Sequence, residues 1–258
     1  MTWLLKVFDP GAWFLHAYGL VGLFFLHTGR ITADPAVHRV WAATVAAAAG
    51  SSALLFCVGA LRVGAGAELF GGLALRDLLV RWGLSVVGIM GSLRLVQAVI
   101  TFNDRLIEAF ARAVSLPSFP PLLNGGILAI LLLWLPTAVL AMVWLVTYLV
   151  RLMELYALAA AAPLAMASIT LPETTVFFRS WFWELIAVTF TQAAQALVLL
   201  LMQSVALPGG DAFPESAFFT LALLYVMVRI PAWMRQLGAR SAPASPWVAA
   251  LVAARGVL

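Results

Sequence analysis

Residues 122–150 read LLNGGILAILLLWLPTAVLAMVWLVTYLV, a run of twenty-nine residues without a charged side chain. A helix needs about 20 predominantly apolar residues to cross the ~30 Å hydrocarbon core of a bilayer, and this run exceeds that length. Because lipid offers no hydrogen-bond partners, a spanning segment has to satisfy its own backbone groups, as a helix does. The run shows no alternation of the kind that a closed barrel requires. It therefore predicts a membrane-spanning helix.

The rest of the 258-residue chain has the same character. Apolar residues make up 64% of it and charged residues 10%, against roughly one half and one quarter in soluble domains. A soluble protein of this composition would lack the polar surface to cover its core. We therefore expect an all-α, polytopic transmembrane protein with about six to seven spans. The candidate spans are residues 11–28, 40–63, 83–101, 122–150, 152–171, 181–207 and 217–230.

The connections between these spans are short, so residues 1–258 are expected to form a single transmembrane domain. Residues 62–82 are rich in glycine and carry charges, which fits a loop, a short interfacial helix or a re-entrant hairpin. In residues 102–121 apolar side chains recur at helical spacing before a group of prolines, which predicts an amphipathic helix along the membrane surface. The tail over residues 231–258 also contains prolines and is expected to be interfacial.

The arginines lie mostly at span ends, where they anchor helices and set their orientation, rather than in a patch that would bind nucleic acid. The loop over residues 208–216 has acidic residues and no basic one, whereas the chain beyond it carries four arginines. The C-terminus is therefore expected on the cytoplasmic side of the cell (inner) membrane. Counting back through seven spans places the N-terminus outside. The N-terminal half inverts if the glycine-rich segment 62–82 re-enters the membrane, or if residues 122–150 and 152–171 form one bent element.

Arg94 lies inside the third candidate span, with Gln97 one turn later. A charge in the bilayer costs roughly 2.5–3.5 kcal/mol on insertion scales, so such a residue is a candidate functional group. It would line a pore or contact a partner. Alternatively, the arginine reaches the headgroups or pairs with a carboxylate on another helix.

The sixth candidate span carries the most organised polar pattern. At ~100° per residue its polar side chains fall within one arc of the helix, which cannot face lipid. This face either lines a passage or forms hydrogen bonds between helices. The residues are Glu184, Thr191, Gln192, Gln195 and Gln203.

Two prolines and two tryptophans have positional meaning. Pro136 and Pro163 each lie within a candidate span, where the missing backbone donor predicts a kink. Trp181 and Trp183 open the sixth span and are expected to anchor it at the membrane interface. Arg151 separates the fourth and fifth candidate spans, and with Glu154 it forms either an interfacial turn or a charged pair buried in one long helix.

The sequence offers little for an enzyme, and we expect no catalytic residues, cofactor or metal. His16 and His27 lie eleven residues apart on one expected helix, about 16 Å by helical rise, so they cannot share a metal ion. The glycines at residues 64 and 66 are not followed by a third glycine at the spacing of a dinucleotide-binding loop.

Residues 151–203 carry a family resemblance. An Ala-Pro-Leu step at 162–164 leads to a Leu-Pro-Glu-Thr turn at 171–174, and Phe178 and Trp181 then open a long helix with glutamines. This pattern resembles the core of the TrbL/VirB-type polytopic inner-membrane proteins of type IV secretion and conjugation systems. A last span that ends at a proline, Ile230-Pro231, is also similar.

The resemblance implies a non-enzymatic channel or scaffold subunit of a DNA-transfer machine. Its partners would be further copies of itself, other transfer subunits including an ATPase, and the lipid bilayer, with nucleic acid only as the transported substrate. The alternatives are a small-solute permease, which should show repeats and a midplane site, and a membrane scaffold of another assembly.

Overall fold

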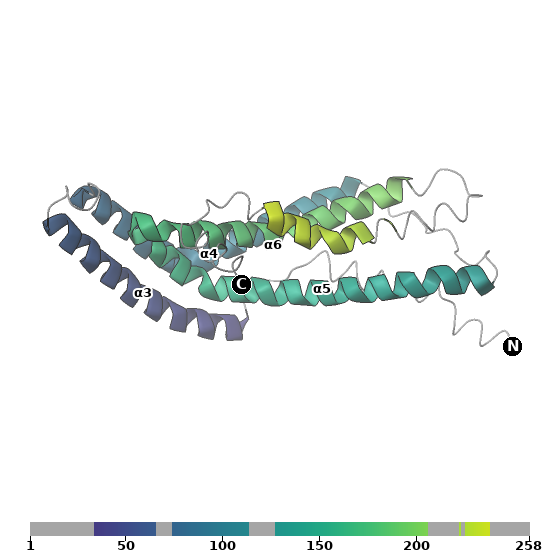
Figure 1. The fold of residues 1–258 in the computed structure, drawn as a ribbon, viewed down its shortest axis with the longest axis horizontal. Coiled ribbons are helices and arrows are strands. Elements are labelled where there is room, and N and C mark those ends of the chain that lie inside the picture. Colours follow the sequence, from purple (N-terminus) through teal and green to yellow (C-terminus); the bar gives the residue numbers. More distant parts are fainter. Residues whose placement is uncertain (1–33, 66–73, 114–126, 206–221, 223–224, 238–258) are drawn as a thin grey trace, which may run out of the picture. The chain divides into compact units, whose positions relative to one another are not determined.

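The computed structural model describes residues 34–65, 74–113, 127–205, 222 and 225–237, which are almost entirely helical and contain no strand. The elements are α3 (Pro35–Gly64), α4 (Leu75–Ala113), α5 (Ile127–Ala167), the 3₁₀ turns η4 (Ser168–Thr170) and η5 (Pro172–Thr174), and α6 (Thr175–Val205) (Figure 1). A further helix covers residues 225–237. The all-α fold class is confirmed.

Among the described residues, three helices are long and apolar enough to cross a membrane: Pro35–Gly64, Leu75–Phe110 and Leu145–Thr170. They contain the candidate spans 40–63 and 83–101 and nearly all of 152–171. The span predicted at 11–28 lies outside the described residues. The structure therefore supports a membrane protein, while the total of six to seven spans stays a prediction.

The chain divides into two compact units. Unit 1 comprises residues 1–29, 100–152 and 189–233, and unit 2 comprises residues 30–99, 153–188 and 234–258. Helices α4, α5 and α6 each contribute one part to each unit.

Helix α4 differs from the predicted arrangement. Residues 75–82 and 102–113 were expected in separate interfacial segments, but they belong to the same continuous helix as the span 83–101. Its buried side chains recur at helical spacings of three, four or seven residues from Leu78 to Ile107, so one packing face continues past both expected boundaries. These buried residues are Leu78, Ser85, Ile89, Ser92, Val96, Ile100, Asn103 and Ile107.

Helix α5 likewise joins the fourth and fifth candidate spans into one element of 41 residues. At 1.5 Å per residue it is roughly 60 Å long, about twice the hydrocarbon thickness. Arg151 does not interrupt it, because its side chain is only 6% exposed and is hydrogen-bonded within unit 1. Of the two interpretations that the sequence left open, the long helix is the one observed.

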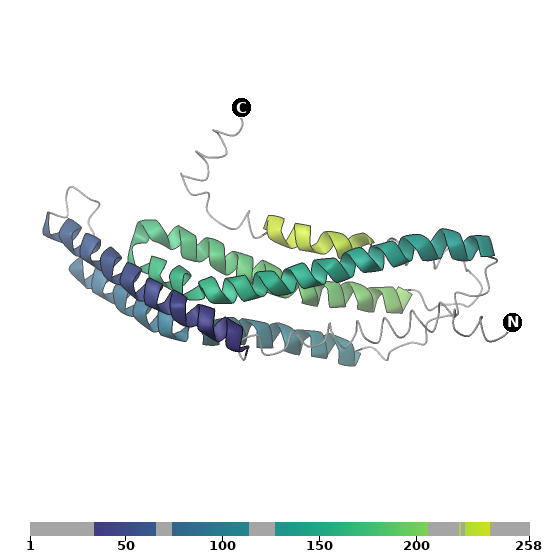
Figure 2. The same ribbon diagram turned by 90° about the horizontal axis from the view of Figure 1, so that it is seen from below.

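Within unit 2, α3 lies beside the first half of α4 in both views (Figures 1 and 2). Asp34 caps the helix, since its Oδ1 accepts a hydrogen bond from the Ala36 amide at 2.8 Å, and Pro35 occupies the first turn, where no backbone donor is needed. Further along, Ser52 Oγ lies 3.2 Å from Ser85 Oγ and 3.3 Å from Thr170 Oγ1. These buried hydroxyls link α3 to α4 and η4.

Pro163 shows how α5 continues through a proline. A proline removes one intrahelical hydrogen bond and crowds the preceding turn. The carbonyl that loses its donor is that of Ala159, four residues earlier. The carbonyls on either side of it accept side-chain donors from other helices: Leu158 from Trp181 Nε1 at 3.0 Å, and Ala160 from Thr44 Oγ1 at 2.8 Å. The backbone next to the proline is thus held by neighbouring helices, as is common in membrane proteins. The predicted kink itself is not tested, and the side chain of Pro136 lies outside the described residues.

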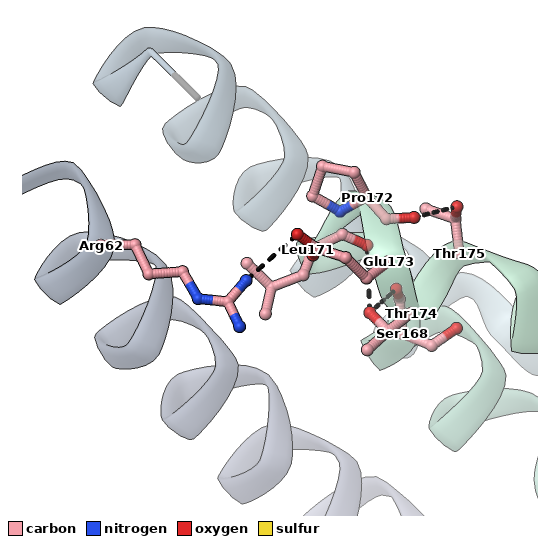
Figure 3. A network of polar contacts seen from close by, with 7 residues as sticks. All are labelled: Arg62, Ser168, Leu171, Pro172, Glu173, Thr174 and Thr175. Atoms are coloured by element: carbon pink, nitrogen blue, oxygen red, sulfur yellow. Dashed lines mark hydrogen bonds and ion pairs between the residues drawn. The ribbon is translucent and has the colours of Figure 1, made fainter. Parts of the chain in front are cut away.

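The Leu-Pro-Glu-Thr turn at 171–174 connects α5 to α6 by two 3₁₀ turns, with Leu171 extended between them. Its threonines satisfy the exposed carbonyls: Thr174 Oγ1 donates to Leu171 O at 3.0 Å and Thr175 Oγ1 to Pro172 O at 2.6 Å. Figure 3 shows Arg62 reaching from α3 to Glu173, with Nη1 and Oε1 3.1 Å apart. The turn thus stabilises itself and is tied to α3.

Candidate functional site: a buried polar cluster

Unit 1 contains a polar cluster in which α4, α5 and α6 meet. Arg151 Nη2 donates to Gln192 Oε1 at 3.0 Å and to the Thr189 carbonyl at 3.1 Å. Asn103 Nδ2 donates to the same Gln192 Oε1 at 3.3 Å. We call Asn103, Arg151, Thr189 and Gln192 the polar cluster. One glutamine oxygen therefore connects a side chain from each of the other two helices.

These hydrogen bonds matter for stability because the groups that form them are buried. Asn103, Thr189 and Gln192 are each 0% exposed. An arginine removed from water is tolerated when hydrogen bonds satisfy its donors, and leaving it without acceptors costs several kcal/mol. Gln192 and the Thr189 carbonyl supply acceptors to Arg151, so the register of α5 against α6 is specified by charge-assisted hydrogen bonds as well as by apolar packing.

Two atoms of the polar cluster have no hydrogen-bond partner among the described residues, namely Asn103 Oδ1 and Thr189 Oγ1. The Thr189 side chain thus differs from its backbone carbonyl, which accepts the bond from Arg151. Its hydroxyl can be replaced without removing a hydrogen bond to any described residue, which makes Thr189 a useful control position.

Gln195 lies one turn beyond the polar cluster and makes a different contact. Its Nε2 donates to the carbonyl of Met227 at 3.2 Å. That carbonyl lies four residues before Pro231, so it is the one whose intrahelical donor the proline removes. The helix over 225–237 therefore continues past Pro231, where the sequence predicted that the last span would end. An apolar contact between Tyr148 and Met227, flanked by Val198 and Val228, packs the same region.

The predicted polar face of the sixth span thus splits into two parts. Thr191, Gln192 and Gln195 are 3%, 0% and 4% exposed, and hydrogen bonds of the two glutamines join α6 to neighbouring helices. Glu184 is about half-exposed and lies 3.6 Å from Arg235, measured from Oε1 to Nε. The side chain of Gln203 lies outside the described residues.

Arg94 is exposed and Gln97 half-buried. Near Arg94, the indole of Trp41 at the start of α3 donates to Ser92 Oγ at 3.0 Å. The start of α3, which carries the polar residues His38 and Arg39, therefore lies at the same level as this part of α4. This arrangement favours the alternative in which the Arg94 side chain reaches the headgroups at that level.

The two tryptophans behave differently. Trp183 is 37% exposed, as an interfacial anchor requires, whereas Trp181 is 5% exposed and packs inside unit 2. The indole of Trp181 donates to the Leu158 carbonyl of α5, and the role of the two tryptophans as membrane anchors stays a prediction.

The sequence analysis did not identify Asn103 and Arg151 as partners of Gln192, or Arg235 as the partner of Glu154. Asn103 had been assigned to the start of a surface segment, and Arg151 was considered only together with Glu154. Glu154 instead pairs with Arg235, which also faces Glu184, so one arginine connects carboxylates of α5 and α6. A polar residue in register with the buried face of α4 was the signal that could have identified Asn103. Among the described residues no group of His, Cys, Asp and Glu could hold a metal ion.

Comparison with known proteins identifies a family. A family model described as conjugal transfer protein TrbL matches residues 78–252, more than half of the chain, including every residue of the polar cluster. No curated protein and no solved structure matches the chain.

Proposed function

Because this chain belongs to the family of conjugal transfer protein TrbL, a membrane subunit associated with conjugal transfer and type IV secretion, we propose that it is a non-enzymatic channel or scaffold subunit of a DNA-transfer machine. Its membership of a multi-subunit transfer complex follows from the family. The channel or scaffold role is the proposal.

The polar cluster is the observation that best supports a scaffold role. A glutamine that binds side chains from two neighbouring helices fixes their register, and a subunit that has to present a constant surface to partners needs such a core. The same contacts turn Gln192 and Gln195 toward other helices of unit 1. A passage for DNA would therefore be lined by other surfaces, contributed by several copies.

The proposal includes location and partners. The chain lies in the cytoplasmic membrane with its C-terminus inside, and it assembles with further copies of itself and with other transfer subunits. An ATPase among those partners supplies the energy. Nucleic acid meets the chain only as the transported substrate.

A small-solute permease was the alternative. Secondary transporters build their site from helices interrupted near the midplane, whereas α4, α5 and α6 are each continuous over the residues described. This observation favours the transfer subunit.

Deletion and complementation test the proposal. In a donor strain lacking this gene, the frequency of conjugal DNA transfer should fall and the wild-type gene should restore it. A Gln192→Leu variant should still insert in the membrane but give less assembled complex and less transfer. Thr189→Val, at the same depth, serves as the matched control and should behave as wild type. Unchanged transfer in the deletion strain, together with reduced uptake of a solute, would overturn the proposal in favour of a permease.

A further inference from the structure

The helix over residues 225–237 has two faces of opposite character. Met227 and Ile230 are 1% and 5% exposed and pack in unit 1. The opposite face exposes Tyr225, Arg229 and Trp233, at successive turns. Tyr225 is 54% exposed and Trp233 47%. We call these three residues the aromatic–arginine face.

Arg229 lies at the centre of this face, and its guanidinium has no carboxylate partner among the described residues. Its guanidinium carbon lies 5.9 Å from the centre of the Tyr225 ring, and no described residue forms an ion pair with it. Arg235, six residues later, faces both Glu154 and Glu184. Of the two arginines on this helix, Arg235 is neutralised by carboxylates, whereas within the described part of the chain Arg229 is not, so its charge is the one that can bind an anion from outside.

The composition and extent of the face indicate the anion. Tyrosine and tryptophan concentrate at the membrane–water interface because each ring has an apolar body and a polar edge. By helical rise, the three residues extend over about 12 Å along the helix. The headgroup layer of one leaflet is roughly 5–8 Å thick, and the reach of the side chains makes up the difference. The face therefore has the length expected where a helix passes from the hydrocarbon into the headgroup layer.

We propose that the aromatic–arginine face binds the phosphate of an anionic phospholipid in the leaflet nearest the C-terminus. Arg229 donates to the phosphate, while the rings of Tyr225 and Trp233 lie against the glycerol and the upper acyl chains. The bound lipid holds the outer face of a helix whose inner face is fixed by Gln195. The inference concerns lipid binding and does not depend on the transfer role.

The test uses the full chain purified with native lipid and returned to vesicles of phosphatidylcholine, alone or mixed with phosphatidylglycerol of equal chain length. Native mass spectrometry then counts retained lipids of each kind. The wild type should retain phosphatidylglycerol in preference. Arg229→Gln should lower that preference about fivefold, the factor expected for one basic residue at an anionic surface, and Arg229→Lys should keep most of it.

Arg62→Gln is the matched control, because Arg62 is also exposed but already binds Glu173, and it should leave the preference unchanged. An unchanged preference in Arg229→Gln would overturn the proposal. It would also be overturned if Arg229→Gln kept the lipid preference but lost binding of a single-stranded oligodeoxynucleotide, since the face would then contact DNA. Lipid retention is measured without DNA transfer, so this inference and the proposed function can fail separately.

Discussion

At the residue scale, Gln192 Oε1 accepts hydrogen bonds from two side chains, those of Arg151 and Asn103. Leucine at this position would leave the Arg151 guanidinium and the Asn103 amide each short of a buried acceptor. An unmet buried donor costs about 1–3 kcal/mol, and interhelical bonds in membranes lie toward the lower end of that range. We expect Gln192→Leu to lower the free energy of unfolding by about 1–3 kcal/mol, measured by denaturant titration in mixed micelles.

Thr189→Val tests whether that loss comes from the hydrogen bonds. The threonine hydroxyl has no partner among the described residues, and the carbonyl that Arg151 uses is unchanged by the substitution. Removing an unpaired buried hydroxyl at nearly constant volume should shift the free energy of unfolding by less than about 0.5 kcal/mol or raise it. A loss as large as that of Gln192→Leu would mean that the site responds to side-chain shape.

The sequence was sufficient to predict that Gln192 and Gln195 do not face lipid, but it left open whether they line a passage or bond to other helices. It was insufficient to predict their partners. Asn103 and Arg151 lie 89 and 41 residues from Gln192, and only the packed register of three helices brings them together. For the same reason Glu154 was paired with Arg151, its neighbour in sequence, when its partner is Arg235.

At the element scale, two glycines of α3 provide an internal comparison. A Cβ at Gly59 would lie 2.6 Å from Leu78 Cδ1 and 3.1 Å from Leu171 Cδ2, whereas nothing lies within 4 Å of a Cβ at Gly50. Overpacking costs about 1–3 kcal/mol, and alanine is favoured over glycine in an open helix position by up to about 1 kcal/mol. Gly59→Ala should therefore be less stable than Gly50→Ala in thermal unfolding in detergent. Equal midpoints would show that Leu78 moves aside freely.

The helix over 225–237 allows a double-mutant cycle between Pro231 and Gln195. Pro231→Ala restores the backbone donor to the Met227 carbonyl, so Gln195 should then matter less. We expect Gln195→Leu to cost about 0.5–1.5 kcal/mol in the wild type and clearly less in the Pro231→Ala background. Equal costs in both backgrounds would show that Gln195 does not substitute for the donor that the proline lacks.

Element boundaries were the weakest part of the sequence interpretation. Pro231 was predicted to end the last span, and at Arg151 the sequence left open either an interfacial turn or one long helix, because a proline or a charge often ends a membrane helix. In the structure a side chain from another helix satisfies the freed carbonyl in one case, and buried acceptors satisfy the guanidinium in the other. Both compensations depend on tertiary contacts that local sequence does not encode.

At the scale of the whole molecule, helix length does not identify the residues that lie in the hydrocarbon, because α5 alone is roughly twice as long as the hydrocarbon core of a bilayer is thick. The charges are more informative. Glu154, Glu184 and Arg235 lie together and their side chains are 32–47% exposed, which suits a headgroup level. From Glu184 to the end of α6 no charge occurs over 21 residues (185–205), roughly 30 Å, enough to reach the opposite surface.

This arrangement makes the orientation a single testable choice. Because Arg235 contacts Glu184, the end of the helix over 225–237 and the start of α6 lie at the same level, and we predict that the acidic loop over 208–216 is on the opposite side of the membrane. The positive-inside bias then predicts a cytoplasmic C-terminus. A green fluorescent protein fused after residue 258 should fluoresce and alkaline phosphatase fused there should be inactive, whereas phosphatase inserted in the loop over 208–216 should be active. The reverse pattern would invert α6 and the last helix together. Matching activity at both sites would contradict the proposed arrangement, in which α6 and the helix over 225–237 each cross the membrane once.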